Sequence, residues 1–69
     1  MPYGQITRIE VERGFGFIHD DSGQDWFFVR EGVRTPGFEQ LWTGERVAFA
    51  KEWTPSGPRA TDIHHEQLD

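Results

Sequence analysis

The chain has 69 residues, no cysteine and a formal net charge of −5 at pH 7, from twelve acidic and seven basic residues. This length predicts a single domain over residues 1–69, and the lack of cysteine excludes disulfides and thiolate metal sites. The acidic balance argues against nucleic acid as a partner, although the placement of charges matters more than their sum. The sequence contains neither a secretion signal nor an apolar stretch of membrane-spanning length, so we expect a cytoplasmic protein with no membrane partner.

Glycine and proline interrupt the chain at short intervals and leave no run long enough for a substantial helix. The intervening runs are short and rich in β-branched and aromatic residues, which predict strands. We expect five strands, at about residues 5–11, 15–20, 25–30, 46–53 and 59–65. Five short strands in so small a chain favour a closed barrel, because closure hides the unpaired edges of a sheet.

The second strand carries the most informative segment, Arg13–His19, in which two phenylalanines each follow a glycine. Alternation along a strand places Phe15, Phe17 and His19 on one face. The opposite face carries the glycines and Ile18, and it can turn toward a core. Two exposed rings on one strand form a platform on which unpaired bases stack. The alternative is that both phenylalanines only pack inside a hydrophobic core.

Residues 20–24 predict a hairpin turn into the third strand. On that strand, alternation separates Phe27 and Val29 from Trp26 and Phe28. If the phenylalanines of the second strand point outward, Phe27 is their outward neighbour across the hairpin. Trp26 is then expected inside the barrel. The alternative is that Trp26 is displaced to the surface and stacks on bases.

The longest connection spans residues 31–45, is interrupted at Pro36–Gly37 and contains two aromatic residues. Phe38 either stacks on a base or anchors the loop, and both interpretations stay open. Trp42 either contacts a partner or covers the barrel, and we favour packing. We expect a monomer, although so long a connection also permits a dimer formed by strand exchange.

Two features suggest chemistry but do not converge on a site. His64 and His65 are adjacent, so on a strand they point to opposite faces and do not share one metal ion. The acidic pair Asp20 and Asp21 falls in a turn, with no nucleophile or phosphate loop implied beside it. We therefore expect neither an enzyme nor a cofactor.

These motifs resemble those of the bacterial cold-shock proteins, the cold-shock domain family, over nearly the whole chain. The segment Arg13–Ile18 (RGFGFI) is similar to the family's first ribonucleoprotein motif, and Asp25–Val29 (DWFFV) is similar to the second. The resemblance implies a five-stranded antiparallel OB-type barrel that binds single-stranded RNA and DNA, often with a preference for pyrimidines. It also implies an RNA chaperone or a regulator of transcription or translation.

The chain departs from the family around the aromatic face. Arg8 stands where the family has an exposed tryptophan, Val29 where it has histidine, and Arg30 where it has phenylalanine. Arginine can stack on bases and reach phosphates, so we expect binding to persist, weaker and more salt-dependent. The alternative is a protein-interaction module on the same barrel. The candidate nucleic-acid-binding residues are Arg8, Arg13, Phe15, Phe17, His19, Phe27, Arg30, Phe38 and Arg59.

Overall fold

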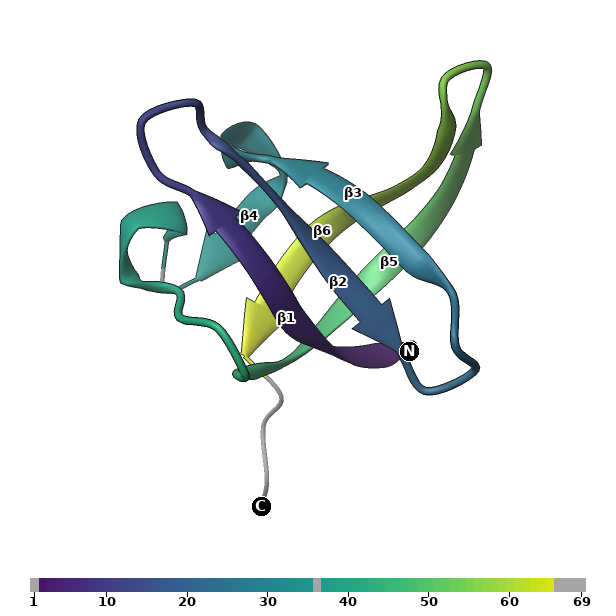
Figure 1. Cartoon of the computed structure of the whole chain (residues 1–69), viewed down its shortest axis with the longest axis horizontal. Coiled ribbons are helices and arrows are strands. Elements are labelled where there is room, and N and C mark those ends of the chain that lie inside the picture. Colours follow the sequence, from purple (N-terminus) through teal and green to yellow (C-terminus); the bar gives the residue numbers. More distant parts are fainter. Residues whose placement is uncertain (1, 36, 66–69) are drawn as a thin grey trace.

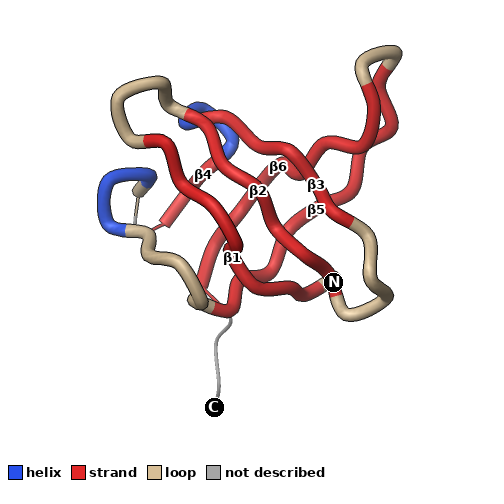
Figure 2. The backbone as a smooth tube through the Cα atoms, in the orientation of Figure 1, coloured by secondary structure: helices blue, strands red, loops and turns tan. Residues whose placement is uncertain are grey.

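The computed structural model describes residues 2–35 and 37–65. Within these ranges the chain forms an all-β barrel with two single-turn 3₁₀ segments (Figures 1 and 2). The elements in chain order are β1 (Tyr3–Glu10), β2 (Phe15–Asp20), β3 (Asp25–Val29), η1 (Arg30–Gly32), β4 (Val33–Thr35), η2 (Phe38–Gln40), β5 (Arg46–Thr54) and β6 (Gly57–His65). Neither helical turn, nor any other helix in the described ranges, is long and apolar enough to cross a membrane.

The five longer strands form a closed ring, in the order β3-β2-β1-β5-β6, and β3 pairs again with β6. Neighbouring strands of the ring are antiparallel except at this closure, where Phe27 pairs with Arg59 in a parallel arrangement. An odd number of strands cannot alternate in direction all the way round, so one pair has to be parallel. The predicted five-stranded OB-type barrel is confirmed, with the addition of this parallel closing pair.

The predicted strands agree with the observed ones to within two residues at each end. The third strand stops at Val29, and Arg30 opens the turn η1 instead of continuing the strand. The sequence did not predict β4, a three-residue strand inside the long connection that pairs in parallel with the end of β6. So short a strand leaves no periodic pattern, and it forms because β6 lies beside it. The predicted break at Pro36 lies outside the described residues.

The core is rich in aromatic residues, as expected from the inward faces of the strands. Trp26 is 1% exposed, which confirms its predicted place inside the barrel, and its ring centroid lies 6.1 Å from that of Phe49. The indole nitrogen donates a 2.8 Å hydrogen bond to the buried carboxylate of Asp20, so its N–H is satisfied without water. The largest fully buried side chains are Trp26, Phe28, Phe49, Ile6, Ile18, Ile63 and Val47.

Asp20 organises the β2–β3 hairpin from inside. Its carboxylate accepts hydrogen bonds from the backbone N–H groups of Ser22 and Gln24, at 2.9 and 2.8 Å. The Ser22 hydroxyl, Trp26 and the Lys51 ammonium are further donors to it. Burial by itself raises the pKa of Asp20, but these hydrogen bonds outweigh it and hold the pKa well below its ordinary value.

Candidate nucleic-acid interface

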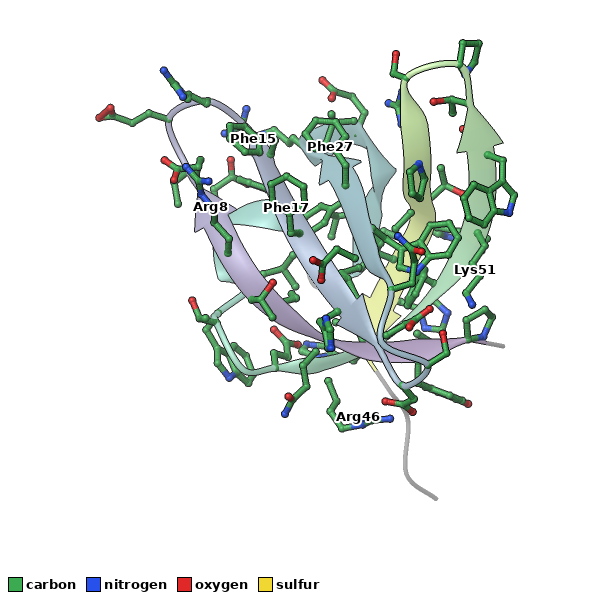
Figure 3. The ribbon with its side chains drawn as sticks, turned by 45° about the vertical axis from the view of Figure 1, so that its right-hand side comes forward. Arg8, Phe15, Phe17, Phe27, Arg46 and Lys51 are labelled. Atoms are coloured by element: carbon green, nitrogen blue, oxygen red, sulfur yellow. The ribbon has the colours of Figure 1, made fainter. Side chains whose placement is uncertain are left out.

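Three phenylalanine rings lie together on the outer face of β2 and β3 and are called the aromatic platform here (Figure 3). Phe15 and Phe17 come from β2, and Phe27 is paired with Phe17 across the hairpin. The three ring centroids lie 5.6 to 6.1 Å apart, and each side chain is only partly buried. The predicted outward arrangement of these rings is therefore present, as a contiguous apolar face open to solvent.

The inner face of β2 explains why the rings point outward. Gly16 lies between the two phenylalanines and faces the first strand and the core. A Cβ atom on Gly16 would lie 2.5 Å from the Arg8 carbonyl oxygen and 2.6 Å from the Phe28 ring. The glycine thus lets the β1 backbone and a core ring pack directly beneath the platform.

Arg8 reaches the platform because of an irregularity in β1. The pairing of β1 with β2 shifts between Ile6 and Arg8, so Thr7 is an extra residue. Simple alternation from the buried Ile6 would send Arg8 into the barrel, whereas the bulge turns it outward beside Phe17. The Arg8 guanidinium lies 5.7 Å from the Phe15 ring centroid, and its Nε donates a 2.8 Å hydrogen bond to Glu10.

Two further predicted arginines flank the platform without an ion pair to any described residue. Arg13 is exposed in the turn between β1 and β2. Arg59 lies on β6, at the position that pairs with Phe27. Together with the loop between β5 and β6, Arg59 and Phe27 line a hollow of about 250 Å³. Arg13 therefore lies two residues before Phe15 in the chain, and Arg59 lies beside Phe27 in the sheet.

His19 occupies the far end of the same outer face, as alternation predicts. Its Nδ1 lies 2.7 Å from Asp25 Oδ1, and both side chains are exposed. The neighbouring carboxylate reduces the attraction of this end of the face for a phosphate.

Phe38 and Arg30 are not part of the open platform. Phe38 is 2% exposed, and its ring packs against that of Phe28 with centroids 6.1 Å apart. Of the two interpretations left open for Phe38, its burial supports the loop anchor, because a base cannot reach the ring. The Arg30 guanidinium lies over Phe38 and binds Glu39 and the Val11 carbonyl. The long connection folds these side chains onto the barrel, an arrangement that strand alternation does not predict.

Two exposed tryptophans lie apart from the platform. Trp53 on β5 is 70% exposed, with one edge against the buried Trp26. Trp42 is 56% exposed, and its ring lies beside that of His65. The expected packing of Trp42 on the barrel is therefore only partial. The sequence analysis did not consider Trp53 as a contact, although its place near the tip of a hairpin was a signal of exposure.

Comparisons with protein-family models and with individual proteins indicate the same family. The family model described as the "'Cold-shock' DNA-binding domain" matches residues 2–65. The chain is 40% identical over 63 residues to the major cold shock protein of Streptococcus pyogenes serotype M6, covering 91% of this chain and 94% of that protein. It is 33% identical to cold shock protein 2 of Lactiplantibacillus plantarum and 32% identical to cold shock protein CspC of Bacillus subtilis, each covering 91% of this chain and 96% of the relative.

Proposed function

Because the chain belongs to the cold-shock domain family, whose members bind nucleic acids and are not enzymes, we propose that it binds single-stranded RNA and DNA on the aromatic platform. The observation that carries this proposal is the contiguous, half-exposed set of Phe15, Phe17 and Phe27 on one sheet face. Each ring offers a surface for one base, and such stacking contributes about 1–3 kcal/mol per base.

In this proposal the arginines around the platform bind phosphates or extend the stacking surface. Arg13 and Arg59 would bind phosphates, since neither has an ion pair with a described residue. Arg8 would extend the stacking surface beside Phe15, at the cost of its contact with Glu10. His19 would contact a base at the end of the face. Stacking depends on neither the sugar nor the identity of the base, so RNA and DNA are both accepted. The preference for pyrimidine-rich strands is what the resemblance to the cold-shock family implies.

Its cellular role would follow from this binding mode. A protein that stacks unpaired bases opposes the re-formation of base pairs and needs no ATP to do so. We therefore place the chain among RNA chaperones or regulators of transcription and translation, in the cytoplasm. One barrel presents a complete platform, so a monomer suffices for this function.

The proposal is tested by titrating a fluorescent heptathymidine with the wild type and with Phe15→Ala and Phe17→Ala. We expect micromolar or tighter binding by the wild type and a loss of about fivefold or more in each variant. Trp42→Ala is the matched control, because it removes an exposed aromatic ring outside the platform. If the folded wild type does not bind at tens of micromolar, the proposal is wrong.

A protein-interaction module is the second candidate, supported by the exposed rings of Trp42 and Trp53. Exposed aromatic side chains are enriched where proteins bind one another. This function predicts weak oligonucleotide binding that hardly changes with salt, and a protein partner whose binding is lost in Trp42→Ala or Trp53→Ala. The heptathymidine titration, repeated at low and moderate salt, therefore separates the two candidates.

A further inference from the structure

Arg30 joins two loops at the edge of the platform. Its Nη2 donates a 2.8 Å hydrogen bond to the carbonyl of Val11, in the turn between β1 and β2. Its Nε donates a 2.9 Å hydrogen bond to the Glu39 carboxylate, in η2. The guanidinium carbon also lies 4.9 Å from the ring centroid of the buried Phe38. One planar group therefore contacts both loops and the core residue that anchors the second loop.

The β1–β2 turn is shaped around this guanidinium. Gly14 has a φ of +72°, and a Cβ atom there would lie 2.7 Å from Arg30 Nη1. The arginine thus occupies the space that a side chain at position 14 would need. The backbone adds two hydrogen bonds of 2.8 Å, from the Arg30 N–H to the Gly14 carbonyl and from the Gly14 N–H to the Glu10 carbonyl. Arg13 immediately precedes this glycine, so its position depends on the same turn.

We propose that Arg30 is a positioning residue that holds the β1–β2 turn against η2 and thereby places Arg13 and the start of β2 for nucleic acid. This inference rests on the proposed function and refines it. Two of the five N–H donors of Arg30 are engaged by Glu39 and the Val11 carbonyl, so the guanidinium is already committed to holding the two loops. Lysine has no planar fork, so it cannot hold both loops at once.

The test compares heptathymidine affinity over a range of salt for the wild type, Arg30→Lys and Arg30→Ala. A positioning role predicts that both variants bind about fivefold more weakly and share one salt dependence, because the charge at position 30 meets no phosphate itself. Near-wild-type affinity of Arg30→Lys would overturn the proposal, since retained charge would then suffice. A slope shallower in Arg30→Ala than in Arg30→Lys, by about 0.7 in log affinity against log salt, would also overturn it, because the charge at position 30 would then itself meet a phosphate.

The Glu39→Gln variant shows whether Glu39 holds Arg30 in place or competes with the nucleic acid for its guanidinium. The positioning role predicts weaker binding, by about twofold, because a neutral acceptor holds the guanidinium less firmly. Binding tighter than that of Glu12→Gln, which removes the same charge from an exposed turn position, would show that Glu39 only withholds Arg30 from the nucleic acid, and would overturn the proposal. Arg34→Lys is the matched control, because Arg34 is also exposed and pairs with a carboxylate, that of Asp62, away from the platform. It is expected to leave affinity and salt dependence unchanged.

Amide hydrogen exchange, measured without nucleic acid, tests the positioning role of Arg30 independently of the proposed nucleic-acid binding. Exchange of the Gly14 amide reports on the β1–β2 turn. Exchange of the Asp20 amide, which donates to the Gln24 carbonyl, reports on the β2–β3 hairpin at the other end of β2. We expect both Arg30 variants to speed exchange at Gly14 and leave Asp20 unchanged. Unchanged exchange at Gly14 would overturn the positioning role even if heptathymidine binds. Absence of binding by the wild type would instead overturn the proposed function, while the exchange data would still test Arg30.

Discussion

Arg8 shows how a single side chain can both extend the platform and be held back from a ligand. Its guanidinium lies over Phe15, a contact worth about 0.5–1 kcal/mol at an exposed site. The same group pairs with Glu10, an exposed ion pair that contributes at most about 1 kcal/mol. A nucleic-acid strand must therefore compete with Glu10 for Arg8, and the carboxylate also repels its phosphates.

We accordingly expect Glu10→Gln to bind heptathymidine about two- to fivefold more tightly than the wild type, because it frees Arg8 and removes a repulsive charge. The control is Glu12→Gln, which removes the same charge from the neighbouring turn. Fluorescence titration measures both affinities. Equal gains in the two variants would mean that overall charge, and not the contact with Arg8, limits binding.

Asp20 is the residue on which the β2–β3 hairpin depends most. Five donors converge on its buried carboxylate, including the indole of Trp26 and the ammonium of Lys51. We expect Asp20→Asn to lower the free energy of unfolding by about 1–3 kcal/mol, because an amide presents a donor where donors already point. Asp21→Asn is the control, since it removes only an exposed, solvent-screened pair with Arg46 and should lower stability much less. Chemical denaturation measures both.

The lowered pKa of Asp20 also fixes the sign of a pH effect. Its folded pKa lies below the unfolded value of about 3.9, so its contribution to stability is complete above that value. The contribution is lost as the pH falls from about 4 toward the folded pKa. Thermal melts should therefore show a steeper fall in stability below about pH 4 for the wild type than for Asp20→Asn. Parallel curves for the two proteins would contradict this assignment.

At the scale of the element, β2 depends on having two different faces. One face presents the platform rings, and the other brings Gly16 against the β1 backbone and Phe28. Strand alternation produces this division, and the missing side chain at Gly16 permits the close approach. The platform is therefore a property of the whole β1–β2–β3 sheet and not of the exposed rings alone.

Gly16→Ala should destabilise the fold by about 1–3 kcal/mol or more, because the added methyl group overlaps backbone and a core ring. Gly32→Ala is the matched control, since a Cβ there meets its nearest atom at an ordinary 3.5 Å. The control should change stability by less than about 1 kcal/mol. Urea titration followed by tryptophan fluorescence gives both values. A Gly16→Ala protein as stable as the control would show that β1 can move away.

At the scale of the whole molecule, the net charge of −5 opposes a polyanionic partner, so local charge has to decide binding. The arginines on the platform side provide that local charge, but Arg8 and Arg30 are paired with glutamates. Only a few phosphates can then be neutralised at once. If the chain binds nucleic acid as proposed, we expect stacking to supply the larger share of the affinity.

A shallow salt dependence follows from this arrangement. If Arg13 and Arg59 each meet one phosphate, log affinity should fall with log salt with a slope of about −1.4, at about 0.7 per phosphate for a single strand. Phe15→Ala should lower affinity and leave the slope unchanged, because it removes stacking alone. Titrations at several salt concentrations measure both. A slope near zero for the wild type would exclude the phosphate contacts assigned to these arginines.

The resemblance to the cold-shock family implied that Phe15 and Phe17 point outward, whereas the sequence by itself determined the barrel, its five longer strands and the common face of these two rings. These features follow from alternation along single strands and from glycines at turns, which are local rules. The inward place of Trp26 follows from the same rule, given the hairpin between β2 and β3. A pattern within one strand can be read without knowing what the strand touches.

Only the tertiary structure decided where Arg8, Phe38 and Arg30 lie. The bulge at Thr7 depends on the register between two strands, and it reverses the face that alternation assigns to Arg8. The burial of Phe38 and the two-loop contact of Arg30 depend on how residues 31–45 fold back onto the barrel. Contacts between segments distant in the chain carry no period in the sequence, so packing alone fixes them.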